Sequence, residues 1–342
     1  MLTVKNLTIS LREGSFERQL IENISFTLKS GESLGIVGES GSGKTITALS
    51  ILKLLPPGMR ISGGDILLEQ TQPPATAPEI SVETPPMLNL ATLSEKQIIA
   101  FRGRVISMIF QEPMTSLNPS MRCGDQIGEA VGLHTDLSGL NVKDKVKSLL
   151  AEVHLPGSAE FYRKYPHQLS GGQRQRVMIA MALAGNPEIL IADEPTTALD
   201  VTVQKKILEL LEEIRKNRQM SMLFISHDLG VIRTICENAL VMYDGKIVEA
   251  GKVSQLFDNA GNPYTKGLIA CRPGKSETGS NKPQRLPTLS DFMDQSSVSI
   301  SQPEAGNPKP GRDKKPLRPI DQITTTPEES PLLEVSNLRV EY

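Results

Sequence analysis

Short apolar runs alternate with amphipathic stretches along much of the chain. Continuous apolar character predicts buried strands at residues 33–37, 104–110, 188–194 and 222–225. Between these strands, apolar residues recur at helical spacing, most clearly in the expected helix at residues 202–220. Strands that alternate with helices predict an α/β fold with a mostly parallel sheet, whose ligand binds at the carboxyl ends of the strands.

A second pattern, in which apolar and polar positions alternate, is typical of half-buried strands. It occurs at residues 2–11 and 24–28, and a further strand is expected at residues 66–68, after a turn at residues 62–65. We expect these strands to form an antiparallel β flap that accompanies the parallel sheet. Further along the chain, Asp244-Gly245 predicts the tight turn of a hairpin.

Two insertions interrupt the α/β pattern. Residues 112–168 contain amphipathic helical segments and no strand pattern, which predicts a helical subdomain inserted into the core. Residues 70–87 are rich in proline and poor in large apolar residues, as is typical of a solvated loop.

The composition changes after residue 271. Residues 272–331 are rich in Pro, Ser, Gly, Lys and Gln, which predicts a linker or disordered tail. Residues 333–338 (LEVSNL) then repeat the pattern of residues 2–7 (LTVKNL), so we expect residues 332–342 to be the first strand of a truncated second domain. Chance similarity between two short amphipathic strands is the alternative.

Composition and charge argue against a nucleic-acid-binding, a secreted or a membrane-spanning protein. The chain has 342 residues and a net charge of -2, so it has no broad basic field that would attract nucleic acid. Cys123, Cys236 and Cys271 are scattered and match no metal spacing, which indicates reduced thiols in a cytosolic protein. No signal peptide is evident, and no run approaches the roughly 20 apolar residues of a membrane span. Any role at a membrane therefore requires a partner.

The candidate chemistry begins directly after the strand at residues 33–37. The motif G-x-x-x-x-G-K-[ST] is matched by Gly38-Glu39-Ser40-Gly41-Ser42-Gly43-Lys44-Thr45, and a helix-like segment follows at 46–55. Glycines let successive backbone amides converge on phosphate oxygens, and the helix dipole favours the same anion. Lys44 can then reach the β- and γ-phosphates, and the Thr45 hydroxyl can ligate Mg²⁺. A chance match by a glycine-rich turn is the alternative, but the strand and helix around the loop favour nucleotide binding.

Polar side chains also follow two other predicted strands. Asp193 suits an acid that holds a Mg²⁺-bound water, and Glu194 beside it can polarise the water that attacks the γ-phosphate. After the strand at 222–225, His227 can hydrogen-bond the γ-phosphate and hold the attacking water as a neutral imidazole. An acidic pair at a strand end is often only solvated, but its position in a phosphate-loop protein favours a function.

A second glycine-containing motif precedes the helix-like segment at 174–184. It reads Leu169-Ser170-Gly171-Gly172-Gln173. A serine hydroxyl, two glycine amides and a helix N-terminus can hold a γ-phosphate from the opposite side. Alternatively, Ser170 is an ordinary N-cap and the glycines form an ordinary turn.

In this order, these motifs resemble the nucleotide-binding subunit of ATP-binding cassette (ABC) transporters. The resemblance covers about residues 1–271 and implies a P-loop ABC ATPase core. Residues 38–45 resemble Walker A, residues 169–173 the signature and residues 189–194 Walker B, and His227 resembles the switch histidine.

The resemblance adds roles that the residues alone do not give. It implies that Gln111 is the Q-loop residue, which takes part in catalysis and contacts Mg²⁺, and that Asp200, in the D-loop, contacts the nucleotide. It also implies that two cassettes close on two ATP molecules, each held between one Walker A and the signature of the other cassette. The aromatic residue that stacks on adenine has one candidate upstream of the loop, Phe16.

The subfamily is indicated by two further segments, residues 110–119 (FQEPMTSLNP) and 262–268 (NPYTKGL). They resemble the dipeptide and oligopeptide importers, and residues 283–287 with the repeat at 333 resemble the linker of the tandem-cassette glutathione importer ATPase. Cys271 alone cannot supply the iron–sulfur cluster of some relatives.

The resemblance implies a peripheral ATPase on the cytoplasmic face of the inner membrane that energises import of peptides, including glutathione. Its implied partners are two permease subunits, a second cassette as a homodimer or fused half, and, indirectly, an extracytoplasmic solute-binding protein. A soluble non-transport ABC ATPase and an inactive truncated remnant of a tandem ATPase are the alternatives.

Overall fold

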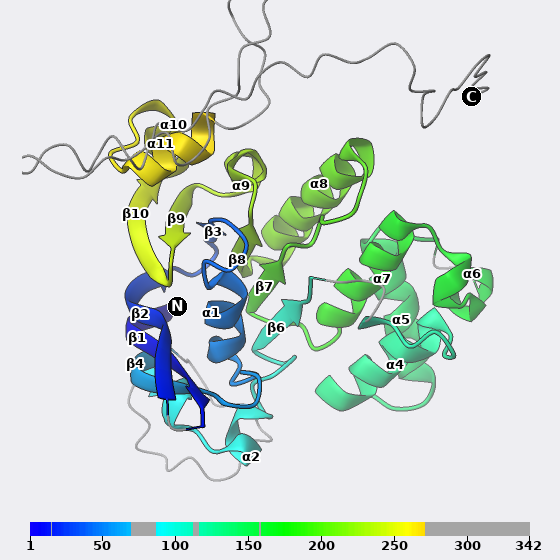
Figure 1. Cartoon of the computed structure of the whole chain (residues 1–342). Helices are drawn as coiled ribbons and strands as arrows, with labels where there is room; N and C mark the ends of the chain where they lie inside the picture. Colours follow the sequence, from blue (N-terminus) through cyan, green and yellow to red (C-terminus); the bar gives the residue numbers. More distant parts are fainter. Residues whose placement is uncertain (15, 70–86, 112–115, 157–158, 271–342) are drawn as a thin grey trace, which may run out of the picture. The chain divides into compact units, whose positions relative to one another are not determined.

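The computed structural model describes residues 1–14, 16–69, 87–111, 116–156 and 159–270 (Figure 1). The expected proline-rich insertion, apart from Met87, lies outside the described residues. So do the expected linker at 272–331 and the strand at 332–342.

A six-stranded sheet forms the centre of the fold, in the order β10-β9-β3-β8-β7-β6. Its strands are β3 (Ser33–Val37), β6 (Ile106–Ile109), β7 (Ile189–Asp193), β8 (Ser221–Ser226), β9 (Asn238–Tyr243) and β10 (Lys246–Lys252). All neighbours pair in parallel except β9 and β10, which form an antiparallel hairpin through Asp244 and Gly245, both at positive φ. The predicted mostly parallel sheet and tight turn are confirmed.

The predicted antiparallel flap is a four-stranded sheet in the order β2-β1-β4-β5. It comprises β1 (Leu2–Glu13), β2 (Phe16–Leu28), β4 (Met59–Glu69) and β5 (Met87–Asn89). The strands run further than the alternation predicts because backbone pairing continues through polar positions, as between Arg12 and Glu17. The side chain of Arg60 in β4 forms an ion pair with Glu17, with 2.9 Å between Arg60 Nη2 and Glu17 Oε1.

The helices are α1 (Lys44–Ile51), α2 (Glu95–Ile98), α4 (Cys123–His134), α5 (Leu140–Glu152), α6 (Ala159–Arg163), α7 (Gly171–Ala182), α8 (Val201–Arg218), α9 (Leu229–Ile235), α10 (Val253–Asp258) and α11 (Pro263–Ala270), with short 3₁₀ turns at Leu90–Thr92 and Pro166–Gln168. Figure 1 shows α4, α5, α6 and α7 grouped beyond β6, and α1 between the flap and the central sheet.

The central sheet is buried on both faces, which explains the continuous apolar runs. Along β8, Met222 and Phe224 pack with the helices α4, α5, α7, α8 and α9, whereas Leu223 and Ile225 pack with α1 and the flap. Successive side chains of a strand point to opposite faces, so both sets must be apolar. This double burial fixes the carboxyl ends of the strands, where the candidate residues lie.

The two cysteines in the described part, Cys123 and Cys236, are buried and unpaired, and burial raises the pKa of the Cys123 thiol to about 11. The expectation of free thiols therefore holds for these two, whereas Cys271 lies outside the described residues. None of the helices that the structure describes is both long and apolar enough to span a membrane.

Candidate functional site

The loop between β3 and α1 has the backbone geometry that the glycine motif predicts. Gly41 and Gly43 have φ of 83° and 100°, a region that other residues rarely adopt. A Cβ atom on Gly38 would collide with the carbonyl oxygen of Met242, so only glycine fits there. The helix begins at Lys44, not at residue 46, because the motif's lysine and threonine already belong to its first turn.

Lys44 lies inside the curl of this loop. Its Nζ donates hydrogen bonds to the carbonyl oxygens of Gly38 and Glu39, both at 2.8 Å. Burial lowers the pKa of Lys44, and the carboxylates of Glu194 and Asp193 oppose this shift. These two hydrogen bonds tie the side chain of Lys44 to the backbone at the start of the loop.

Two oxygen donors meet where β7 ends and α1 begins. The Thr45 hydroxyl donates a hydrogen bond to Oδ1 of Asp193 at 3.2 Å. Asp193 is 1% exposed, and burial raises its pKa from 3.8 to about 6. Oxygen ligands are those that Mg²⁺ prefers, and a buried carboxylate without full charge compensation favours a cation. The donor set therefore fits Mg²⁺, although no group of three or more His, Cys, Asp or Glu residues forms a metal cluster within the described part of the chain.

Next to Asp193, three polar side chains contact one carboxylate oxygen of Glu194. Oε2 accepts hydrogen bonds from Gln111 Nε2 at 3.3 Å and from the Thr197 hydroxyl at 2.8 Å, and it lies 3.1 Å from His227 Nδ1. The φ of Glu194 is 45°, and its amide donates to the Ile225 carbonyl of the neighbouring strand.

Thr197 is a contact that the sequence interpretation missed. The available signal was a hydroxyl three residues after the candidate base, two residues after Pro195. The Thr197 hydroxyl can reach the Glu194 carboxylate only because the backbone turns between the two residues. A hydrogen bond from the Thr197 amide to the Glu194 carbonyl oxygen closes this turn.

The serine of the second glycine motif is an N-cap. Ser170 Oγ accepts a hydrogen bond from the Gln173 amide at 3.3 Å, and Gln173 Oε1 accepts one from the Ser170 amide at 3.1 Å. This capping box starts α7 at Gly171, three residues earlier than the sequence indicates. A Cβ atom on Gly172 would lie 2.6 Å from Val203 Cγ1, so the glycine lets α7 approach the start of α8.

The structure separates this motif from the phosphate loop. Within the described residues, no hydrogen bond joins residues 170–173 to residues 38–45. Asp200 caps α8, with its Oδ1 2.9 Å from the Val203 amide nitrogen. The fold therefore brings together Lys44, Thr45, Gln111, Asp193, Glu194 and His227. The nucleotide contacts of residues 170–173 and Asp200 stay predictions.

Phe16, the candidate for adenine stacking, lies at the start of β2 and is 80% exposed. The described residues contain no further aromatic contact to it. Its role stays a prediction.

Known proteins are similar to this chain in sequence. The family model described as ABC transporter matches residues 21–197. The chain belongs to the ABC transporter family. It is 44% identical over 288 residues to the oligopeptide transport ATP-binding protein OppD of Bacillus subtilis, which covers 84% of this chain and 76% of OppD. It is 40% identical over 339 residues to the glutathione import ATP-binding protein GsiA of Escherichia coli, which covers 99% of this chain and 49% of GsiA. The chain thus spans about half the length of GsiA.

A solved structure extends the likeness to the fold of an ABC cassette. The dimeric ATP-binding cassette MJ0796, in a post-hydrolysis state bound to ADP and Pi, matches with a TM-score of 0.62 and 27% identity. The match covers 74% of this chain and 99% of that one. The predicted ABC ATPase core is confirmed, and the chain is an ATPase of this family.

Proposed function

We propose that this chain is the ATP-hydrolysing subunit of an importer of peptides, including glutathione and di- or oligopeptides. The names of its relatives OppD and GsiA support the transported class. The observation that carries the chemistry is the convergence of Gln111 and His227 on Oε2 of Glu194, beside the phosphate loop.

The chain's own groups suit hydrolysis of the γ-phosphate. The amides of the loop and Lys44 bind the phosphate oxygens, and the N-terminus of α1 favours their charge. As water attacks the γ-phosphorus, Glu194 accepts its proton and the bond to ADP breaks. His227 holds the attacking water and the γ-phosphate.

Thr45 and Asp193 would hold Mg²⁺, the latter through a water, and Gln111 would join them after leaving Glu194. When bound, Mg²⁺ neutralises charge on the phosphate oxygens. The fit rests on the 3.2 Å approach of the two oxygens and on the buried, undercompensated carboxylate of Asp193.

A second cassette completes the site in this proposal. Ser170 and Gly171 are exposed and have no bond to the chain's own phosphate loop within the described residues. They are therefore available to a nucleotide held by another cassette, either a second copy or a fused half. The dimeric state of MJ0796 with ADP and Pi supports this arrangement.

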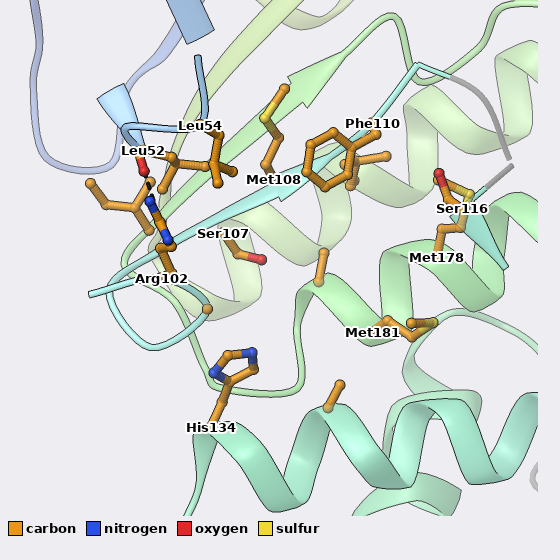
Figure 2. A pocket seen from close by; sticks show the side chains of 15 residues that line it. Leu52, Leu54, Arg102, Ser107, Met108, Phe110, Ser116, His134, Met178 and Met181 are labelled. Atoms are coloured by element: carbon orange, nitrogen blue, oxygen red, sulfur yellow. Dashed lines mark hydrogen bonds between the residues drawn. The ribbon is translucent and has the colours of Figure 1, made fainter. Parts of the chain in front are cut away.

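An apolar groove is the docking place that we propose for a permease. A groove of about 280 Å³ lies between the central sheet and the helical layer (Figure 2). Its apolar lining comes from the segment after α1, from the end of β6 and from α7, and includes Leu52, Leu54, Phe110, Met178 and Met181. Leu54 and Phe110 are 37% and 43% exposed, as suits a surface that a partner covers.

One residue of the groove's lining, Phe110, links the groove to Glu194 through its neighbour in sequence. Phe110 directly precedes Gln111, whose side chain bonds Glu194. A permease segment that displaces Phe110 would therefore shift Gln111. We propose that each of two permease subunits docks in such a groove, at the cytoplasmic face of the inner membrane, and that a solute-binding protein delivers the peptide from outside.

The domain organisation is part of the same proposal. Residues 1–271 form the cassette, with residues 112–168 as its helical subdomain. Residues 272–331 are a linker, and 332–342 begin a second cassette. The similarity to GsiA over 339 residues, beyond the matched family domain, supports this assignment.

The proposal is tested with the full chain, a second cassette and a peptide permease pair reconstituted in vesicles. We expect ATP-dependent uptake of labelled dipeptide or glutathione, and its loss in Lys44→Ala. Uptake that is independent of the chain, or ATPase activity that permeases and peptide leave unchanged, would contradict it.

A further inference from the structure

The motif NPYTKGL, at residues 262–268, places a tyrosine against the phosphate loop. Tyr264 lies in the first turn of α11 and is 1% exposed. Its hydroxyl oxygen accepts a hydrogen bond from the Glu39 amide at 3.0 Å. The two residues are 225 positions apart, so this contact joins the last described helix to the nucleotide site.

The surroundings of Tyr264 fix its hydroxyl in place. The Tyr264 amide donates to Asn262 Oδ1 at 2.8 Å, and the carboxylate of Glu249 accepts from the amides of Gly261 and Asn262 at 2.6 and 3.2 Å. The ring packs on Tyr243 of β9, with centroids 4.5 Å apart. Burial raises the pKa of Tyr264, which keeps the hydroxyl neutral. The helix is therefore held to the β9–β10 hairpin, and the ring cannot swing away without losing these contacts.

Glu39 connects this hydroxyl to the lysine that binds phosphate. Its amide donates to Tyr264, and its carbonyl oxygen accepts from Lys44 Nζ at 2.8 Å. A shift of Glu39 therefore changes the position of an acceptor that Lys44 must leave when phosphate binds. The other side of the loop is held by the Gly245 amide, which donates to the Ser42 carbonyl at 3.2 Å.

We infer that Tyr264 is a positioning residue, through which the C-terminal helix α11 holds the phosphate loop open for nucleotide. The inference rests on nucleotide binding at residues 38–45. Without the hydroxyl, the Glu39 amide loses its fixed acceptor, and the loop samples conformations that must be reordered on binding. The loss of the hydroxyl should therefore weaken nucleotide binding and leave the rate of the chemical step unchanged, because Tyr264 has no contact with Glu194 or Asp193 within the described residues.

The test compares Tyr264→Phe with Tyr243→Phe in the full chain. Tyr264→Phe keeps the ring and its packing on Tyr243 and removes only the hydroxyl. We expect the Kd for ATP, measured by titration with a fluorescent analogue, to rise roughly fivefold, which corresponds to about 1 kcal/mol. The kcat at saturating ATP should stay the same. Tyr243→Phe, which removes a hydroxyl that makes no bond to the loop in the described residues, should leave both values unchanged.

Hydrogen exchange provides a readout that does not depend on activity. The Glu39 amide should exchange faster in Tyr264→Phe and at the wild-type rate in Tyr243→Phe. Unchanged ATP affinity in Tyr264→Phe, or equal losses in both variants, overturns the inference. Lys44→Ala distinguishes the nucleotide site at residues 38–45 from the positioning role of Tyr264. If Lys44→Ala weakens ATP binding and Tyr264→Phe does not, only the role of Tyr264 is wrong. If neither weakens binding, the nucleotide site itself fails.

Discussion

The Thr45 hydroxyl donates a hydrogen bond to Oδ1 of Asp193 across 3.2 Å, between residues 148 positions apart. This bond joins the first turn of α1 to the end of β7 and stabilises the ionised form of the carboxylate. It does not compensate for burial, because the net effect on Asp193 is a pKa raised to about 6. The hydrogen bond from Thr45 and the charge of Lys44 therefore only partly offset the burial of the Asp193 carboxylate.

The first prediction concerns the pH dependence of stability. Because the folded-state pKa of Asp193 lies above the ordinary value of 3.8, the folded chain binds this proton more tightly than the unfolded chain. Its contribution to stability is favourable at low pH and is lost as the pH rises from about 4 to about 6. Asparagine does not titrate, so Asp193→Asn lacks this loss of stability. The free energy of unfolding of the variant, relative to that of the wild type, should therefore rise by up to roughly 3 kcal/mol between pH 4 and pH 7.

Urea denaturation in chelator-containing buffer measures this difference. Asp136→Asn removes a carboxylate whose side chain is 88% exposed, and its stability curve should stay nearly parallel to that of the wild type. Parallel curves for Asp193→Asn as well would show that Asp193 is not buried as described.

The second prediction concerns the base. Glu194→Gln keeps the size of the side chain and removes the carboxylate that, in the proposed mechanism, accepts the proton of water. We expect ATP to bind with nearly wild-type affinity while kcat falls by roughly 10² to 10⁴, the usual contribution of a general base. Single-turnover hydrolysis with labelled ATP measures the chemical step. Near-wild-type turnover would remove Glu194 from the mechanism.

The third prediction concerns Thr197, whose hydroxyl lies 2.8 Å from Glu194 Oε2. Thr197→Val removes this donor at nearly constant volume, so the carboxylate loses one of the three groups that orient it. We expect kcat to fall about tenfold, with little change in the KM for ATP, since one hydrogen bond to a charged group is worth about 1.5 kcal/mol or more. Thr197→Ser keeps the hydroxyl, so its kcat and the pH profile of its kcat should match those of the wild type. Equal rates for the Val and Ser variants would assign the residue to packing alone.

The fourth prediction concerns the contact between α7 and α8. A Cβ atom on Gly172 would lie 2.6 Å from Val203 Cγ1, so Gly172→Ala should destabilise the chain by about 1 to 3 kcal/mol, as overpacking does. Val203→Ala in the same chain removes the obstructing methyl groups and should recover part of the loss. Thermal melting of the single and double variants measures the coupling, and additive losses would contradict a direct clash.

Several elements followed from the sequence because their causes are local. The strands of the central sheet carry apolar residues on both faces, as Met222 and Leu223 illustrate, and this pattern is visible without any fold. The ends of the flap strands were not predictable, since backbone pairing and not side-chain pattern extends them to Glu13 and Phe16. The start of α7 was placed too late because the capping box between Ser170 and Gln173 outweighs the low helix propensity of glycine.

The family and the phosphate-loop motif can be recognised in the sequence alone, because consecutive amides need only glycines and a helix start to converge on one point. How distant side chains meet is visible only in the folded chain. The tertiary structure brings Gln111, Thr197 and His227 to one oxygen of Glu194, and Tyr264 to the amide of Glu39. Such contacts depend on strand order, turn geometry and helix placement, which the packing of the whole core sets and which no short stretch of sequence encodes.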